Sequence, residues 1–368
     1  MTPKLRVRYL APIAALAIAV ALPAATAGAS VKIPKGGVET PPTATLTETG
    51  STLLYPLWNL WVPGYNEEFP HVTIETAGTG SGTGITDATN GTADIGASDA
   101  YLSPSEVQAA PSLLNIPLAI SSQLVVYHVP GVTAHLKLTG KILSEIYRGK
   151  ITNWNDAAIA AINKGITLPD LPIVTVHRSD SSGDTFLFTQ YLTKATPTGW
   201  GTTIRYTTTV TWPTVPGALA ADGNSGMVAT CKTTPGCIAY VGISYQTQAL
   251  QAGLQYAQLQ NAKGAYVLPT PASVAAEAAS FVKKTPANGT ISMIYGPAEA
   301  GYPIINYEYA IVDATQSSST TAKAIRSVLE WAVNPKDGNS STYLAQVSFQ
   351  PLPAKVVAQS LKQILKIK

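Results

Sequence analysis

Short β-rich runs alternate with helical patterns along most of the chain, and this alternation is the feature that most restricts its fold. The β-rich runs lie at residues 72–74, 124–127, 173–176, 238–241 and 307–312. The clearest helical patterns lie at residues 141–147, 186–192 and 320–333. Strands that alternate with helices pair into a sheet whose faces the helices cover. The pattern therefore predicts an α/β fold.

Length and composition extend this prediction to two lobes. The chain has 368 residues, about twice the usual length of one domain. It is 45% hydrophobic and only 12% charged, which excludes a disordered chain and allows a large core. Near residue 104 the sequence Ser-Pro-Ser-Glu predicts a helix start, with Ser103 as N-cap and Glu106 closing a capping box. The last stretch, 355–368, is expected to be a docked amphipathic helix rather than a membrane anchor.

The first 29 residues have the pattern of a secretory signal peptide. Lys4, Arg6 and Arg8 precede an apolar run at 10–22, and small residues follow it. An uncleaved membrane anchor is the alternative, but the run is short for a spanning helix and contains Pro12. No cysteine stands near the cleavage region, so the acylated cysteine of a lipoprotein is absent. We expect an extracytoplasmic protein, secreted or held at the cell surface or in a periplasm, with residues 30–44 as a flexible leader.

The net charge argues against a polyanionic partner. The whole chain carries +3, and residues 1–27 hold three basic and no acidic side chains. The processed chain is therefore neutral, and this gives no reason to expect binding to nucleic acid or to a membrane surface. Any anion would have to be held by a local site.

The two cysteines, Cys231 and Cys237, stand in the sequence Cys-Lys-Thr-Thr-Pro-Gly-Cys. The Pro-Gly pair turns the chain between them, so a small disulfide-closed loop is expected in an oxidising compartment. A metal site is the alternative, but no further His or Cys stands nearby. We expect no metal and no cofactor.

Three loops place glycine and hydroxyl residues directly before a helical pattern. They lie at residues 49–53, 78–84 and 178–184. Free backbone N–H groups and the positive end of the helix dipole favour an anion at such positions. One loop of this kind usually only turns the chain, but three in one chain indicate an anion site.

The third loop carries the most specific chemistry. Arg178 can donate two hydrogen bonds to an oxyanion, and Asp180 can hold the guanidinium in place. The alternative is an ion pair on a solvated loop, which would contribute little. Earlier in the chain, Asp99 ends a short predicted strand. It is either a turn residue or, if the ligand carries a proton, an acceptor for it.

Signatures of catalysis are largely missing. The sequence has no Gly-x-Ser-x-Gly elbow, no Walker A loop and no dinucleotide-binding fingerprint. The four histidines lack metal-ligand spacing. His177 stands near Ser182, but the short separation disfavours a catalytic pair. We do not expect an enzyme, although a secreted phosphatase on the same scaffold and a surface adhesion protein remain alternatives.

Taken together, four segments resemble the PstS-type phosphate-binding proteins of ABC transporters, particularly their actinobacterial members. The segments are 48–56, 78–82, 95–103 and 177–186, and the resemblance extends over the chain after about residue 45. It implies a two-lobed periplasmic-binding-protein fold of type II, in which each lobe has a mixed sheet and hinge strands cross between lobes. It places domain I at 45–125 and 303–368, and domain II at 126–302. It implies a monomer that delivers inorganic phosphate to membrane permease subunits.

The resemblance also implies which residues hold the phosphate. A dehydrated ion would be bound by hydrogen bonds alone, with Asp180 orienting the arginine. The expected ligand-binding residues are Thr52, Leu53, Ser81, Asp99, Arg178, Ser182, Gly183 and Asp184.

Two carboxylates have particular roles in this expectation. An ionised carboxylate only accepts hydrogen bonds, so Asp99 would accept from P–OH and would repel fully deprotonated sulfate. Leu53 replaces a common Phe, which should not matter for a backbone donor. Asp184 replaces a common Thr, and we hypothesise that it accepts a second proton from the ligand.

Overall fold

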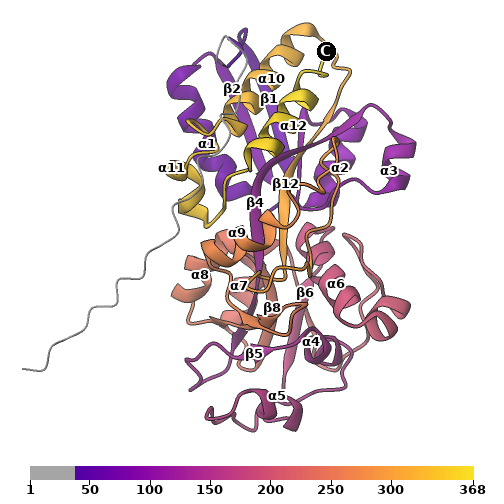
Figure 1. Cartoon of the computed structure of the whole chain (residues 1–368), viewed down its shortest axis with the longest axis vertical. Helices are drawn as coiled ribbons and strands as arrows, with labels where there is room; N and C mark the ends of the chain where they lie inside the picture. Colours follow the sequence, from indigo (N-terminus) through magenta and orange to yellow (C-terminus); the bar gives the residue numbers. More distant parts are fainter. Residues whose placement is uncertain (1–37) are drawn as a thin grey trace, which may run out of the picture. The chain divides into compact units, whose positions relative to one another are not determined.

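The structure, a computed structural model, describes residues 38–368. Its strands in the main sheet are β1 (Ala44–Gly50), β2 (Val72–Gly78), β3 (Ile95–Ser98), β4 (Leu113–His128), β6 (Val174–Arg178), β7 (Leu219–Ala221), β8 (Cys237–Gly242), β9 (Gln255–Tyr256) and β12 (Ile305–Asp313). They pair in the order β2-β1-β3-β12-β4-β8-β6-β7, with β9 also paired to β4 (Figure 1). A small separate sheet contains β5 (Lys137–Leu138), β10 (Gln258–Gln260) and β11 (Tyr266–Val267).

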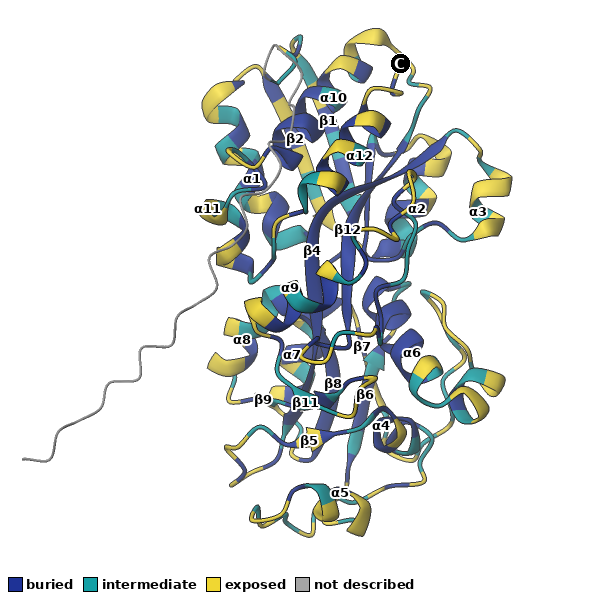
Figure 2. Cartoon of the chain, viewed as in Figure 1, coloured by how far each residue is buried: buried dark blue, intermediate teal, exposed yellow. Residues whose placement is uncertain are grey.

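Strand β4 changes its partner along its length. Residues 113–122 pair with β12, and residues 123–128 pair with β8. We call β2, β1, β3, β12 and residues 113–122 of β4 the first half of the sheet, and the remainder the second half. Every residue of β4 except His128 is buried, as Figure 2 shows along the strand. Burial of successive residues, whose side chains point to opposite faces, is typical of a strand that is covered on both faces.

Both halves of the sheet are mixed. In the first half β1 is parallel to β2 and β3, whereas β12 is antiparallel to β3 and β4. In the second half β6 is parallel to β7 and β8, whereas β8 is antiparallel to β4. The predicted α/β class with mixed sheets and flanking helices is confirmed.

Helices pack against both halves. The α-helices are α1 (Tyr55–Glu68), α2 (Ser81–Asn90), α3 (Pro104–Ala109), α4 (Gly140–Ile146), α5 (Ala157–Ile162), α6 (Gly183–Ala195), α7 (Gly223–Lys232), α8 (Gln246–Gln251), α9 (Pro271–Ala279), α10 (Ser319–Val333), α11 (Ser341–Leu344) and α12 (Ala354–Ile364). Helices α1, α2, α10 and α12 contact strands of the first half, and α6 and α7 contact strands of the second half.

Several elements have the ends or contacts that local sequence signals predict. Helix α3 begins with the expected capping box, in which Ser103 accepts from the Glu106 N–H and the Glu106 side chain accepts from the Ser103 N–H. Helix α12 docks as expected, because Val356 and Ile364 are buried and the Ser360 hydroxyl donates to Pro117 O over 2.6 Å. Within residues 38–368, no helix has both the length and the apolarity that a membrane span requires.

The predicted signal peptide lies outside the described residues, as does most of the expected leader. The described end of the leader makes contacts with the body of the protein. Glu39 accepts two hydrogen bonds from Arg326, over 2.8 and 2.9 Å. Strand β1 begins at Ala44, inside the range expected for the leader. The described residues form one contact unit, so the two domains remain a prediction.

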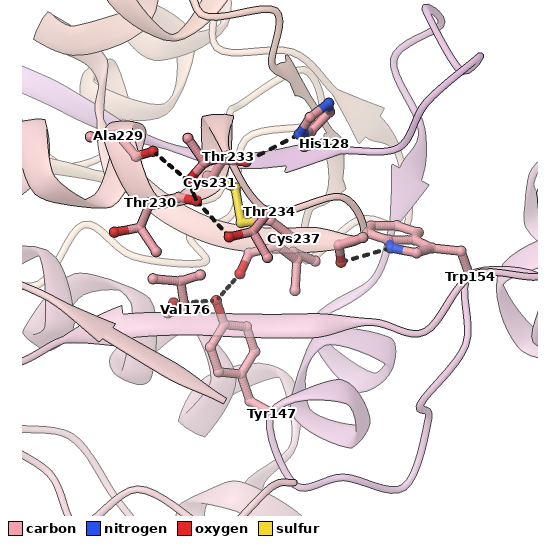
Figure 3. The surroundings of a disulfide bond; sticks show 12 residues. His128, Tyr147, Trp154, Val176, Ala229, Thr230, Cys231, Thr233, Thr234 and Cys237 are labelled. Atoms are coloured by element: carbon pink, nitrogen blue, oxygen red, sulfur yellow. Dashed lines mark hydrogen bonds between the residues drawn. A yellow bond between two sulfur atoms is a disulfide. The ribbon is translucent and has the colours of Figure 1, made fainter. Parts of the chain in front are cut away.

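The disulfide between Cys231 and Cys237 is present, which confirms the predicted pairing (Figure 3). Both half-cystines are fully buried. Around this loop, His128 Nδ1 lies 3.2 Å from Cys231 O, and Trp154 Nε1 donates to Gly236 O over 2.9 Å. The loop is thus held in the second half by hydrogen bonds as well as by its sulfur bridge.

Candidate anion-binding site

The first loop of the site joins β1 to α1. A Cβ atom on Gly50 would lie 2.1 Å from Ala97 O, so only glycine fits there. The Ser51 hydroxyl accepts from the Leu54 N–H over 2.9 Å and so turns the chain into α1. Among residues 38–368, the N–H groups of Thr52 and Leu53 find no acceptor. They are donors at the positive end of α1.

The second loop joins β2 to α2. The Gly80 N–H donates to Gly50 O over 2.7 Å, which ties this loop to the first. Helix α2 begins at Ser81, whose side chain is fully buried. Its hydroxyl accepts from the Asp99 N–H over 3.1 Å. Within the described part of the chain, the Ser81 N–H also finds no acceptor.

Asp99 follows β3 and is 2% exposed. Its Oδ1 accepts a short hydrogen bond from the Ser51 hydroxyl. Burial and then the charge of Asp184 raise the pKa of Asp99 to about 7. The first half of the sheet therefore supplies hydroxyl groups, N–H groups and one carboxyl group.

The third loop begins at Arg178, the last residue of β6, which is 3% exposed. Asp180 accepts from both Arg178 Nε, over 2.6 Å, and Nη2. Asp184 Oδ2 accepts from Arg178 Nη1 over 3.0 Å. Burial lowers the pKa of Arg178, but these two carboxylates outweigh it and raise the pKa above its ordinary value. The guanidinium is therefore charged and fixed in direction.

Asp184 is surrounded by donors. Besides Arg178, Asn224 Nδ2 donates to Oδ2 over 2.6 Å, and Gln123 Nε2 donates to Oδ1 over 2.9 Å. Burial raises the pKa of the Asp184 carboxyl, and Arg178 opposes the rise. Three of its roughly four acceptor positions are taken by protein donors.

Helix α6 begins inside this loop. Ser182 is its N-cap and accepts from the Thr185 N–H over 3.3 Å. In the chain from residue 38 onward, the Gly183 N–H has no acceptor. A Cβ atom on Gly183 would lie 2.3 Å from Asp99 Oδ2 and 2.4 Å from Ser81 Oγ. Glycine is needed here because the two halves of the sheet meet at this residue.

Further contacts join the two halves around the same place. The Gly82 N–H donates to Ser181 O over 3.0 Å, and Asn224 Nδ2 donates to Thr52 Oγ1 over 3.0 Å. The structure therefore brings together all of the residues predicted for the site. They are Thr52, Leu53, Ser81, Asp99, Arg178, Asp180, Ser182, Gly183 and Asp184.

Sequence reasoning missed four polar residues of this cluster. Ser51, Gln123, Asn224 and Glu308 are all buried, and each contacts or neighbours a predicted site residue. Asn224 had a usable signal, because Gly223 and Asn224 are the first residues of helix α7, as Gly183 is the first residue of helix α6. Gln123 and Glu308 stand inside strands and gave no local signal.

The alternative pair of His177 and Ser182 does not form. The His177 ring stacks on Trp212, with 4.9 Å between ring centres, and its Nδ1 lies 3.1 Å from Arg178 O. The histidine ring therefore has partners other than Ser182. Across residues 38–368, no group of three or more His, Cys, Asp or Glu side chains has the arrangement of a metal site.

Comparison of the sequence with known proteins shows the family to which the chain belongs. Residues 37–336 match the model of the PBP superfamily domain. The phosphate-binding protein PstS of Xylella fastidiosa is 33% identical over 331 residues, which are 88% of this chain and 87% of that protein. The phosphate-binding protein PstS 2 of Mycobacterium tuberculosis is 31% identical over 335 residues, 85% of each chain. These two values do not single out the actinobacterial members.

The fold matches solved structures as well. The high-affinity periplasmic phosphate-binding protein PfluDING, solved with phosphate, aligns with a TM-score of 0.68 at 22% identity. The alignment covers 85% of this chain and 92% of that one. Since 22% identity supports the fold alone, the sequence relatives carry the assignment. The chain belongs to the PstS family of phosphate-binding proteins within the PBP superfamily.

Proposed function

We propose that this protein binds one inorganic phosphate ion outside the cytoplasm and delivers it to the permease of an ABC transporter. The observation that carries the proposal is the meeting of three helix N-termini and one buried arginine around a buried acceptor, Asp99. Phosphate is the ion that needs both donors and an acceptor, because at neutral pH it carries negative charge and at least one proton.

The donors suit a dehydrated tetrahedral anion. Free N–H groups at Thr52, Leu53, Ser81 and Gly183 belong to three different helix starts. Helix N-termini favour anions through these groups and through the helix dipole. Arg178 adds the only positive charge among the proposed ligand-binding residues. Asp180 holds the guanidinium in a fixed orientation by accepting a hydrogen bond from Arg178 Nε. Together these groups can surround an ion from several sides.

Asp99 supplies the selectivity in this proposal. Ionised, it accepts a hydrogen bond from P–OH, whereas sulfate would place a second negative charge against it in a dry site. An unmatched buried polar group can reduce binding by about 10⁴-fold. Asp184 is proposed as a second acceptor. Its three protein donors leave roughly one acceptor position for a ligand proton.

Binding and release would involve hinge motion about β4 and β12. The two proposed domains, 45–125 with 303–368 and 126–302, divide near the point where β4 changes partner, at residues 122 and 123. The contacts of Gly82 with Ser181 and of Asn224 with Thr52 would form only in the closed state. Opening of the domains would expose the ion to the permease.

Thermal unfolding with different anions tests the proposal. We expect phosphate and arsenate to raise the Tm, because a ligand at a hundredfold excess over its Kd stabilises a protein by about 2.7 kcal/mol. Sulfate and citrate should leave the Tm unchanged, and Asp99→Asn should narrow the gap between phosphate and sulfate. A Tm increase with sulfate alone would contradict the assignment.

A further inference from the structure

A second buried carboxyl group lies behind Asp99. Glu308 belongs to β12 and is fully buried. Strand β12 pairs with β3, whose last residue precedes Asp99, and Tyr309 lies opposite Ser98. Asn306, two residues before Glu308, donates from Nδ2 to Asp99 O over 3.3 Å. Asp99 and Glu308 are therefore neighbours across the pairing of β3 with β12.

The two oxygens of Glu308 have different surroundings. Oε1 accepts from the Ser121 hydroxyl and from Asn306 Nδ2, the latter over 3.1 Å. Oε2 is buried and has no hydrogen-bond donor in the described part of the chain. An ionised carboxylate with one bare buried oxygen would be strongly unfavourable. A proton on Oε2 removes this problem, provided that it has an acceptor.

Asp99 is placed to provide that acceptor. Tyr309 lies opposite Ser98 in the strand pair, so Glu308 and Asp99 stand opposite each other and their side chains interact. Burial raises the pKa of Glu308 well above its ordinary value, and the charge of Asp99 raises it further. A hydrogen bond from Glu308 would in turn lower the pKa of Asp99.

The other ionisable groups that bear on this pair are few. Tyr309 lies close enough to feel the charge of Glu308. On the ligand side of Asp99, Asp184 and Arg178 act on Asp99 with opposite signs. None of these groups supplies a donor to Glu308 Oε2.

We infer that Glu308 is a positioning residue for specificity: it keeps one proton on Oε2 and donates it to Asp99, so that Asp99 meets the ligand as a hydrogen-bond acceptor. The inference rests on the proposed binding of phosphate. No bond to the ligand is involved, and the proton stays within the pair of carboxyl groups.

The pair explains how a buried acid can remain an acceptor near neutral pH. Without Glu308, Asp99 would lose a donor and retain its own proton to higher pH. A protonated Asp99 has an O–H group that can donate to sulfate. Discrimination against sulfate would then weaken, and phosphate binding would need a higher pH.

Two variants of similar length test the inference. Glu308→Gln keeps a donor in the N–H group of the amide, whereas Glu308→Met removes it. We expect E308Q to keep phosphate affinity and the exclusion of sulfate close to wild type. We expect E308M to lower the ratio of phosphate affinity to sulfate affinity about tenfold or more. Its phosphate binding should also recover only at higher pH than that of the wild type.

Isothermal titration of each variant with phosphate and with sulfate, from about pH 5 to about pH 9, gives the readout. Glu330→Gln is the matched control, because Glu330 is a buried glutamate whose Oε2 accepts from the Glu39 N–H, away from this site. If wild type itself fails to bind phosphate, the proposed function is wrong. If wild type binds phosphate and E308M keeps its anion ratio and pH profile, the inference is wrong.

If E308Q and E308M lose the same amount of phosphate-over-sulfate selectivity, the inference is also wrong. A hydrogen-bond donor at position 308 would then not be what sets the selectivity. Ser121→Ala covers the case in which E308M does not fold. Removing the donor to Oε1 makes Glu308 hold its proton more tightly, so S121A should keep the exclusion of sulfate. Loss of that exclusion in S121A would contradict the role assigned to Glu308.

Discussion

The two halves of the sheet bring different chemistry to the same place. The first half contributes two helix starts and Asp99 but no cationic side chain. The second half contributes one helix start and Arg178, which is fixed by Asp180 and Asp184. The second half thus supplies the positive charge, and the first half supplies the acceptor. A phosphate ion bound as we propose would contact both halves, so the proposed selectivity would require the halves to be together.

The two buried aspartates show the same contrast on a smaller scale. Asp184 accepts from a guanidinium and from two amide groups. Asp99 accepts from the Ser51 hydroxyl and has another acid, Glu308, opposite it across the strand pair. Burial is the first cause that raises the pKa of either group, but only Asp184 has a cation in contact. We infer that Glu308 and the proposed phosphate ligand take the place of that cation at Asp99.

The largest effect is expected on removing the positive charge. Arg178→Met leaves the buried Asp184 and the half-buried Asp180 without their cationic partner. Breaking a buried ion pair in this way destabilises a protein by about 3–5 kcal/mol. Phosphate affinity should fall about a thousandfold or more, as measured by calorimetry. Arg178→Lys keeps the charge, and its folded form should bind about tenfold to a hundredfold more weakly than wild type.

Arg326→Met serves as the control for the two Arg178 variants. Arg326 bonds Glu39, and its side chain is 16% exposed. Its loss should leave phosphate affinity unchanged. Equal affinity in R178M and wild type would show that the second half does not supply the charge.

A smaller effect is expected where the halves touch. Gly183→Ala would place a Cβ atom 2.3 Å from Asp99 Oδ2, and overpacking of this kind costs about 1–3 kcal/mol. Because the strain arises only when the halves meet, it should weaken phosphate binding about tenfold to a hundredfold. In Gly226→Ala the nearest atom would be Ala221 Cβ at 3.7 Å, so that variant should bind like wild type. If G183A and G226A bind phosphate with similar affinity, the close approach of Gly183 to Asp99 does not matter for binding.

The last effect concerns the stability of the ligand-free protein at different pH values. The folded pKa of Asp99 is about 7, above that of an unfolded aspartate near 4. The folded state therefore binds more protons between these values, and the stability contributed by this group falls as pH rises from about 4 to about 7. Asp99→Asn removes this fall. Without ligand, the variant should match wild type near pH 4 and exceed it by up to about 4 kcal/mol near pH 8, because the two pKa values differ by about three.

Denaturant unfolding without phosphate, at both pH values, measures this difference. Other buried acids, such as Glu277 with a pKa of about 7, titrate in the same range. Those that do not interact with Asp99 act equally in both proteins, so the difference between the proteins reports on Asp99 together with its neighbours Asp184 and Glu308. A variant that is less stable than wild type near pH 8 would mean that Asp99 is ionised without penalty.

Much of the candidate site could be predicted from the sequence, because its signals are local. Glycine and hydroxyl residues before helices marked the loops at Thr52, Ser81 and Ser182, and helices α1, α2 and α6 do begin there. The strand and helix alternation gave the α/β class. The capping box of α3 and the docking of α12 were predicted on the same basis. Each of these features depends on residues a few positions apart.

The rest depended on pairing between distant segments. Glu308 is far from Asp99 in the chain, and only the pairing of β12 with β3 makes them neighbours. Gln123 reaches Asp184 and Asn224 reaches Thr52 because β4 runs through both halves and the halves meet at Gly183. The amino-acid sequence by itself determined which loops present backbone N–H groups at helix starts, since backbone conformation and helix starts are local properties. Only the tertiary structure decided which side chains share protons and charge there, since those interactions depend on distances that strand pairing and burial set.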